Sequence, residues 1–165
     1  NIDVVVEAVA RLRQQGFQAS LRIVGTGPQE ASLRELTASH RIEDSVEFVG
    51  AIKHDEMHLA YQRADLYVQL SDVEGRSNSI LAAMASGPPI ITTRVGGAAD
   101  LIDGNGVVLD RPEVSEVASA IRSFFEDASL SRSQGRRSRQ LAQRFSLETA
   151  AQRYLELLSN IAGGG

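Results

Sequence analysis

The sequence predicts an α/β protein in which a parallel β-sheet carries helices on both faces. Short runs rich in valine and isoleucine alternate along the chain with longer, helix-like patterns. Strands that alternate with helices pair in parallel, because each intervening helix returns the chain to the same end of the sheet. With right-handed crossovers, this arrangement is a Rossmann-like doubly wound sheet.

Helices are expected where apolar residues recur every three or four positions. The first such pattern ends at Gly16, and a later one has Pro112 in its opening turn. The expected helices span 2–15, 29–40, 55–63, 77–86 and 98–102, followed by one opened by Pro112, one over 131–143 and one entered at Ser146. The residues expected to face the core from these helices are Val5, Ala8, Val9, Leu12, Leu33, Leu36, Val117, Ala118, Ile121, Phe125, Ala150, Tyr154 and Leu157.

Strands are expected where β-branched residues run together between turn residues. They span 20–24, 45–49, 65–70, 89–93 and 106–109, and the first is expected to be buried. No repeat or linker interrupts the alternation, so we expect one domain over residues 1–162 and a flexible glycine tail over 163–165. The chain enters its first helix without a leading strand, and we interpret it as a fragment that lacks the first strand of its sheet.

The composition, 42% hydrophobic and 23% charged, is typical of a globular protein. A formal net charge of −4 argues against a nucleic-acid-binding protein, which would have a basic face. The absence of cysteine excludes disulfides, thiolate nucleophiles and cysteine metal ligands. No apolar run approaches the roughly 20 residues that span a bilayer. These features are compatible with a cytoplasmic location.

Four loops that are distant in sequence are expected at one edge of the sheet, because ligands of such folds bind beyond the carboxyl ends of the strands. These loops are Gly25-Thr26-Gly27, Gly50-Ala51-Ile52-Lys53, residues 71–78 and residues 92–97. In the third loop an acidic turn leads directly into an apolar helix, whose unpaired N–H groups and dipole attract an anion such as a phosphate. Glu74 in this turn is a good acceptor for sugar hydroxyls. This edge of the sheet is therefore predicted to bind a ligand that carries both phosphate and sugar.

Other interpretations of these residues remain open at this point. The Gly25-Thr26-Gly27 turn lacks the third glycine of a dinucleotide fingerprint, because Glu30 occupies that position, so a tight turn explains it equally well. Glu74 by itself is also compatible with an ordinary solvated turn acid. Ser77, Asn78 and Ser79 are expected to cap the helix, and capping and phosphate binding use the same geometry.

Histidine and arginine side chains give two weaker signals. His54 and His58 have the spacing of a metal-binding pair, but no third ligand accompanies them, so we expect a solvated helix face and no metal site.

Five arginines follow residue 128 with no acidic residue until Leu147. These are Arg132, Arg136, Arg137, Arg139 and Arg144. A solvated surface is the favoured interpretation, and attraction to the inner face of an anionic membrane or to another domain is the alternative.

Taken together, the stretches LRIVGTGP (21–28), VEFVGAI (46–52), ADLYVQLSDVEGRSNSILAAMASGPPIITTRVGG (64–97) and GNGVVLD (104–110) resemble the retaining glycosyltransferases of the GT-B fold, in the large "glycosyl transferases group 1" family. The resemblance covers essentially the whole chain, as the C-terminal, donor-binding half of such an enzyme. It implies a hexosyltransferase-type enzyme of polysaccharide biosynthesis that moves a sugar from a UDP- or GDP-sugar to an acceptor with retention and without a metal ion. An N-terminal acceptor-binding domain of the same protein is the implied partner.

The resemblance also implies the roles of individual residues. Glu74 would be the catalytic-site residue that binds hydroxyls of the donor sugar, and the N–H groups of residues 76–79 would hold the diphosphate. Gly25 and Gly27 would lie against phosphate and ribose, and Ala51 and Ile52 would cradle the base. The full set of implied donor-binding residues is Gly25, Thr26, Gly27, Ala51, Ile52, Gly75, Arg76, Ser77, Asn78, Ser79, Ala82, Gly96 and Gly97.

Two departures from the family pattern limit what this chain is expected to do. The family's second glutamate, which binds the ribose hydroxyls, is replaced by Ala82. The family's basic pair, which stabilises the departing diphosphate, would precede Asn1. We therefore expect the isolated chain to be inactive. A degenerate, non-catalytic domain with an assembly or binding role is the alternative, and a nicotinamide-dependent oxidoreductase is disfavoured by Glu30.

Overall fold

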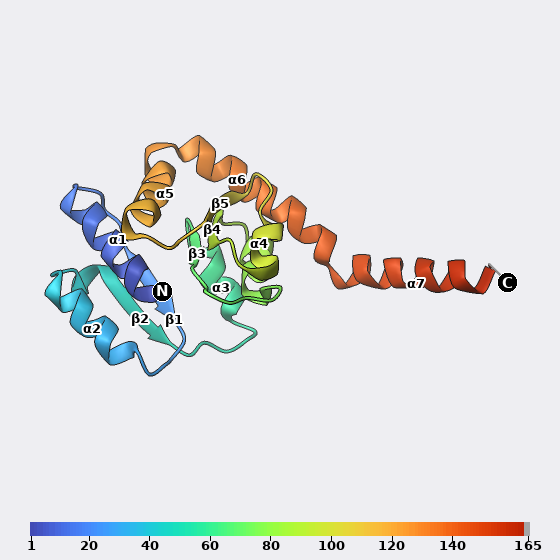
Figure 1. Ribbon diagram of the computed structural model, residues 1–165, viewed down its shortest axis with the longest axis horizontal. Helices are drawn as coiled ribbons and strands as arrows, with labels where there is room; N and C mark the ends of the chain where they lie inside the picture. Colours follow the sequence, from blue (N-terminus) through green and yellow to red (C-terminus); the bar gives the residue numbers. More distant parts are fainter. Residues whose placement is uncertain (164–165) are drawn as a thin grey trace.

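The computed structural model describes residues 1–163. The α-helices are α1 (Ile2–Gln14), α2 (Glu30–Ser39), α3 (Met57–Gln62), α4 (Asn78–Ser86), α5 (Val114–Glu126), α6 (Ala128–Ala142) and α7 (Leu147–Gly163). Short 3-10 helices are η1 (Glu43–Ser45), η2 (Gly96–Leu101) and η3 (Gln143–Phe145). The strands are β1 (Leu21–Val24), β2 (Val46–Gly50), β3 (Tyr67–Gln69), β4 (Ile90–Thr93) and β5 (Gly106–Leu109). The predicted alternation of strands and helices is confirmed, and the fold is α/β with helices around parallel strands (Figure 1).

The strands form two parallel sheets rather than the single sheet that was expected. One sheet pairs β1 with β2, and the other has the order β3-β4-β5. Side chains of both sheets nevertheless pack into one core with α1 and α5, including Leu21 and Ile23 of β1 and Val68 of β3. Burial of apolar side chains therefore holds the two sheets together where no backbone hydrogen bonds join them.

A second apolar cluster lies between α4, α6 and the adjacent strands. It includes Ile80, Met84, Ile90 and Leu141, all of them buried. The ends of α4 are defined by its sequence: the Ser77 hydroxyl accepts a hydrogen bond from the Ile80 N–H, and Gly87 ends the helix at φ 115°. Glycine tolerates this left-handed conformation, which side chains disfavour. The start of α4 is thereby fixed at the carboxyl end of β3.

Two expectations about burial in the body of the molecule, and one about a helix boundary, were wrong. Val24 in β1 is 37% exposed, and β1 pairs only with β2 in a two-stranded sheet. In α5 the buried aromatic residue is Phe124, whereas Phe125 is 48% exposed and its ring is tilted against that of Phe17, with ring centroids 5.9 Å apart. Helical periodicity explains this, since position 124 lies on the same face as Val117 and Ile121. Pro112 also precedes α5, whose N-cap is Glu113.

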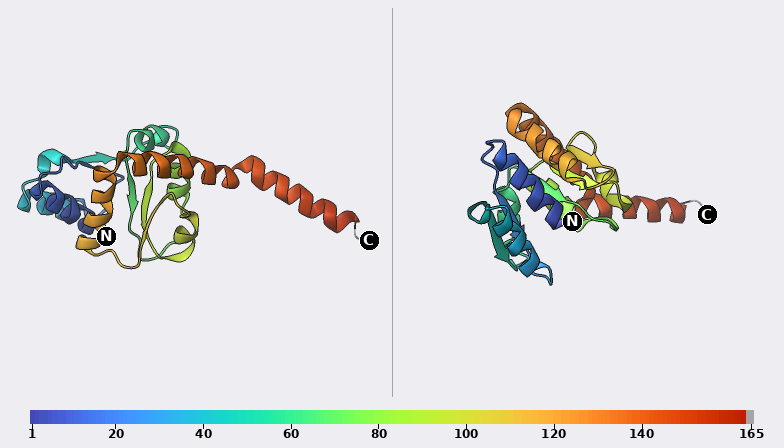
Figure 2. Two further views of the ribbon diagram at one scale, coloured as in Figure 1. Left: turned by 90° about the horizontal axis from the view of Figure 1, so that it is seen from above. Right: turned by 60° about the vertical axis from the view of Figure 1, so that its left-hand side comes forward.

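The last helix departs most from expectation. Helix α7 leaves the body of the molecule in every view (Figures 1 and 2), and its side chains from Ala150 to Asn160 are exposed. Ala150, Tyr154 and Leu157, predicted to face the core, are all exposed, Tyr154 by 64%. The apolar spacing of this helix is real, but no other element of the described chain covers it. Of the expected tail over 163–165, residues 164 and 165 lie outside the described residues.

Candidate functional site

The loops after β1 and β2 meet at the carboxyl end of their sheet. The Gly25 N–H donates to the Gly50 carbonyl oxygen at 2.8 Å, and both glycines have positive φ values, 119° and 75°. A side chain at either position would be strained in this conformation. Thr26 and Gly27 continue from this junction and are exposed, and Ala51 on the neighbouring loop is exposed as well. The structure thus brings together these two sequence-predicted loops, with their backbone open to solvent.

The carboxylate of Glu74 is held in place at the end of the other sheet. Its Oε2 accepts a hydrogen bond from Gln69 Nε2 at 2.6 Å and lies 3.4 Å from the Ser71 hydroxyl. The Gln69 amide is itself oriented by two donors, because its Oε1 accepts from the Tyr67 hydroxyl at 3.0 Å and the Ser77 hydroxyl at 3.1 Å. In the described part of the chain Glu74 Oε1 has no hydrogen-bond donor, so one carboxylate oxygen is fixed and the other is available to a ligand.

Two residues of this network were not recognised in the sequence. Gln69 was assigned only to a strand and Tyr67 was not singled out, although a glutamine at the carboxyl end of a short apolar strand is a usable signal. Burial raises the pKa of the Tyr67 hydroxyl well above its ordinary value, with the adjacent Tyr61 as the next cause. Tyr67 therefore stays protonated and acts as a hydrogen-bond donor.

The glycine turn after β4 packs directly on the acidic turn. The Gly97 N–H donates to the Gly75 carbonyl oxygen at 3.1 Å. Gly96 has φ 47°, and a Cβ atom there would overlap the Glu74 carbonyl oxygen. The Thr93 hydroxyl donates to the Ser71 carbonyl oxygen at 2.6 Å and joins the ends of β3 and β4. Gly96 is therefore required by close backbone contact, which positions the main chain of Glu74.

The first turn of α4 offers unpaired backbone donors beside Glu74. Ser77 is buried and caps the Ile80 N–H, while Asn78 and Ser79 are exposed and their N–H groups have no acceptor in the described chain. Unpaired N–H groups at a helix start, reinforced by the helix dipole, favour an anion. Ala82 lies one turn further along α4 and is exposed. The third and fourth predicted loops thus form one group around Glu74.

The two groups of loops stand at the ends of two different sheets. In the structure, as far as it is described, no hydrogen bond links the Gly25/Gly50 group to the Glu74/Gly97 group. The structure therefore shows that the loops of each pair are neighbours, and the joining of all four into one site stays a prediction.

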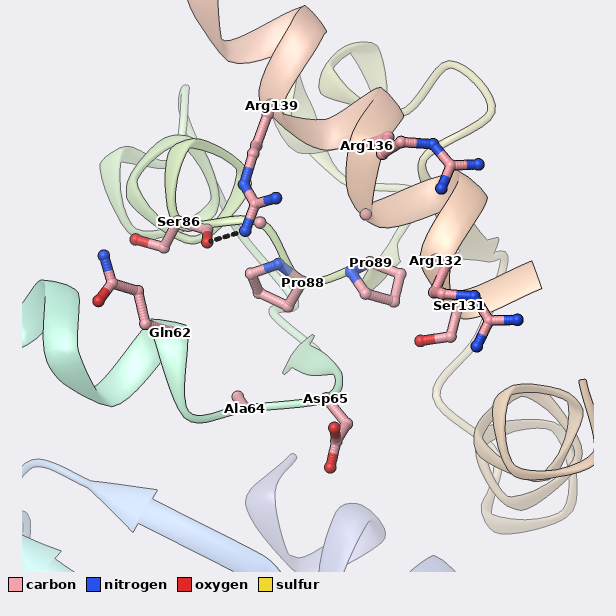
Figure 3. Close-up of a pocket in the computed structure, with 12 residues that line it drawn as sticks. Gln62, Ala64, Asp65, Ser86, Pro88, Pro89, Ser131, Arg132, Arg136 and Arg139 are labelled. Atoms are coloured by element: carbon pink, nitrogen blue, oxygen red, sulfur yellow. Dashed lines mark hydrogen bonds between the residues drawn. The ribbon is translucent and has the colours of Figure 1, made fainter. Parts of the chain in front are cut away.

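A separate pocket of about 350 Å³ lies at the opposite end of the β3-β4-β5 sheet (Figure 3). Its walls come from the end of α3, the α4–β4 turn and α6. Arg139 donates to the Ser86 carbonyl oxygen at 3.2 Å, whereas Arg132 and Arg136 point away from the prolines at the centre of the pocket (Figure 3). None of the sequence-predicted donor-binding residues lines this pocket.

Within residues 1–163, no three histidine, cysteine, aspartate or glutamate side chains are grouped as a metal ion would require. His54 and His58 are both exposed. None of the described helices combines the length and the apolar character of a membrane-spanning segment.

Comparison with known proteins identifies a family. Residues 1–141 match the family described as "Glycosyl transferases group 1". This range includes every strand and the whole of the two loop groups, and it ends within α6, before α7.

Two curated proteins from Mycobacterium tuberculosis are similar to this chain in sequence. A glycogen synthase is 32% identical over 149 residues, which cover 88% of this chain and 36% of that protein. A GDP-mannose-dependent alpha-(1-6)-phosphatidylinositol monomannoside mannosyltransferase is 33% identical over 134 residues, covering 76% of this chain and 35% of that protein. The chain spans about a third of the length of the curated relatives it matches.

A solved structure supports the fold. HepE from Anabaena in complex with UDP has a TM-score of 0.83 and 26% identity, over 95% of this chain and 44% of that one.

Proposed function

The chain belongs to the glycosyl transferases group 1 family, and on that premise we propose that it is the donor-binding part of an enzyme that transfers a sugar from a nucleotide diphosphate. The donor is a UDP- or GDP-sugar, and the transferred unit is a hexose or a related sugar. Relatives support both bases, since HepE was solved with UDP and the mannosyltransferase is named as GDP-mannose-dependent. The transfer proceeds with retained anomeric configuration, as in the enzymes that the motifs resemble.

The observation that carries this proposal is a fixed carboxylate beside unpaired N–H groups. Glu74 Oε2 is held by Gln69 at 2.6 Å, and its Oε1 is available for hydroxyl groups of the donor sugar. The N–H groups of Asn78 and Ser79 have no acceptor in the described chain and can donate to a diphosphate. A sugar bonded to a diphosphate carries hydroxyl groups for the carboxylate and, next to them, phosphate oxygens for the N–H groups. A site for an isolated phosphate would not require an acidic residue next to it.

These groups also suit the chemistry of transfer. When the bond between sugar and diphosphate breaks, negative charge develops on the departing phosphate oxygen. Fixed N–H donors at the start of α4 stabilise this charge without reorganising, which is the largest contribution in many enzymes. Glu74 holds the sugar so that its reacting carbon faces the acceptor. The oriented amide of Gln69 keeps the carboxylate in this position.

We propose that catalysis needs residues outside this chain. Strands β1 and β3 have side chains in one core but share no hydrogen bonds, so each has an open edge. Doubly wound sheets have the strand order 3-2-1-4-5-6, and the observed strands match this order with position 1 empty. Asn1 donates from Nδ2 to the Leu70 carbonyl oxygen at 3.0 Å, where a parallel strand leading into α1 would end. A preceding strand would pair with both edges.

The N-terminal, acceptor-binding domain of the same protein is the proposed partner. The exposed apolar side chains of α7 are the surface in this chain that such a domain would cover. These are Tyr154, Leu155, Leu157 and Leu158, each at least 46% exposed. An isolated helix of this length is marginal in water, so burial of this face would stabilise it. Replacing Leu155 and Leu158 by glutamate in the full-length protein is expected to expose a protease-sensitive helix, whereas unchanged proteolysis would argue against the contact.

For localisation we propose a cytoplasmic enzyme. The alternative is peripheral attachment to the inner face of the membrane. It would use the exposed Arg132 and Arg136 of α6, because Arg137 is already ion-paired with Asp103. Co-sedimentation with vesicles that contain anionic lipid distinguishes the two. Salt-sensitive binding that Arg132→Gln and Arg136→Gln abolish would favour the membrane alternative.

The donor proposal is tested by titration calorimetry with UDP- and GDP-sugars. We expect binding of one of them, weakened at least tenfold by Glu74→Gln, because the charged acceptor is lost. Glu116→Gln on the exposed side of α5 is the matched control and should bind as the parent does. Absence of heat with every donor, for the parent and for Ala82→Glu alike, would refute the proposal.

One alternative has its own observation in its favour. Ala82 replaces the residue that would hold the ribose, which suits a degenerate domain that keeps the fold for assembly or binding. If the full-length protein transfers sugar from a donor, this alternative fails. If it becomes active only as Ala82→Glu, the alternative is supported.

A further inference from the structure

The guanidinium of Arg76, in the turn between β3 and α4, contacts the aromatic ring of Phe145. Arg76 lies two residues after Glu74 and is exposed, and its guanidinium carbon lies 5.4 Å from the centre of the Phe145 ring. In the described chain Arg76 forms no ion pair, whereas Arg94 after β4 is paired with Asp110 at 2.6 Å. The charge of Arg76 is therefore not neutralised by a carboxylate.

The packing of α6 on α4 explains how Phe145 reaches this loop. Gly135 of α6 lies against the Gly87 carbonyl oxygen at the end of α4, and Phe145 beyond the end of α6 lies against Arg76 before the start of α4. The two helices therefore run in opposite directions, and η3 at the end of α6 comes next to the residues that precede α4. Phe145, 38% exposed, presents its ring there.

The contact between Arg76 and Phe145 is weak enough to be exchanged. An exposed cation–π contact changes an equilibrium by about twofold to fivefold. A charge-assisted hydrogen bond between a guanidinium and a phosphate is stronger, about tenfold or more, and an arginine can make two such bonds at once. A diphosphate near the start of α4 would therefore attract Arg76 away from the ring.

We propose that the Arg76 side chain binds the diphosphate of the donor, and that Phe145 competes for it when the site is empty. This inference rests on the proposed function, because it needs a nucleoside diphosphate at the start of α4. It gives Arg76 a second role besides its backbone N–H. The guanidinium places a full positive charge where the departing diphosphate gains negative charge, so the chain supplies one cation of its own to stabilise the leaving group.

The competition predicts opposite effects of two substitutions. Arg76→Gln should weaken binding of the nucleoside diphosphate about tenfold, and Arg76→Lys should restore part of it, because lysine keeps the charge but not the planar fork. Phe145→Leu should tighten binding about twofold to fivefold, because the guanidinium no longer has to leave the ring. In the Arg76→Gln background, Phe145→Leu should have no effect.

Titration calorimetry with UDP and GDP, and with UMP and GMP for comparison, measures these changes in the purified protein. Arg63→Gln, an exposed arginine at the end of α3, is the matched charge control and should bind as the parent does. Circular dichroism melting checks that each variant is folded. A mere surface packing contact would give the same direction of change for Arg76→Gln and Phe145→Leu, and that result would overturn the proposal.

The outcomes also separate this inference from the proposed function. If the parent binds a nucleoside diphosphate and Arg76→Gln binds it equally well, the role of Arg76 is refuted and the donor site stands. If the parent and Ala82→Glu bind no nucleotide at all, both are refuted together.

Discussion

The substitution Ala82→Glu gives the sharpest measure of what this donor site lacks. Ala82 is exposed on α4, one turn after Asn78 and on the same face of the helix. A glutamate there displaces no core side chain, and its lower helix propensity costs only a few tenths of a kcal/mol. A carboxylate that accepts hydrogen bonds from both ribose hydroxyls would contribute about 2 kcal/mol, or roughly thirtyfold in Kd. We therefore expect a large gain in affinity and little change in stability.

Titration calorimetry with UDP or GDP, whichever the parent binds, measures the gain. The matching 2′-deoxyribonucleoside diphosphate is the decisive comparison, because it removes one of the two hydroxyls that the carboxylate would hold. Ala85→Glu, on an exposed position of the same helix, controls for the added charge. An equal gain with the deoxy ligand, an equal gain for Ala85→Glu, or no gain at all would each show that residue 82 does not face the ribose.

Three further predictions concern the geometry that supports Glu74 and the cap of α6. Replacing Gln69 by leucine should lower the free energy of unfolding by about 1–3 kcal/mol, because the hydroxyls of Tyr67 and Ser77 lose their acceptor. It should also weaken donor binding, because the Glu74 carboxylate loses its orientation. Urea denaturation and calorimetry check this, and weaker binding without lost stability would contradict it. Gly96→Ala should destabilise by about 1–3 kcal/mol or more in urea denaturation, because its left-handed backbone and the Glu74 carbonyl leave no place for a Cβ, and a neutral result would contradict the close contact. The Asp127 carboxyl accepts hydrogen bonds from the Ser129 hydroxyl and from the N–H groups of Ser129 and Leu130, which lowers its pKa. Its stabilising effect is therefore present above the ordinary value of 3.8 and is lost as pH falls below it. Melting temperatures of the parent should fall more steeply than those of Asp127→Asn between about pH 5 and 3, and parallel curves would refute this.

The local pattern predicted most of the fold. Strand β5 lies where β-branched residues placed it, at Gly106–Leu109, and α1 and α4 begin and end within a residue or two of the expected positions. These elements have both a clear period and a strong end signal, such as Gly16 or Ser77. The acidic turn and the glycine turn are in contact, which fits the edge rule for parallel sheets because that rule depends only on element order.

What the sequence did not predict depends on long-range contacts. The tie between Gln69 and Glu74 depends on how the end of β3 meets the turn that follows it, and local periodicity contains no such distance. The exposed face of α7 has the same apolar spacing as a buried helix, so spacing alone could not show that the described chain lacks its partner. The burial of Phe124 instead of Phe125 was within reach, since the inward face of α5 was already set by Val117 and Ile121.

The division into two sheets bears directly on the donor site. The Gly25/Gly50 group, expected to contact ribose and base, is attached to one sheet, and Glu74 to the other. Their separation is set here by side-chain packing on α1 and α5, which is less directional than a hydrogen-bonded ladder. A strand between β1 and β3 would fix the carboxyl ends of both sheets in one register. It would thereby hold the two ends of a nucleotide sugar at a constant distance, so the element that completes the sheet would also complete the site.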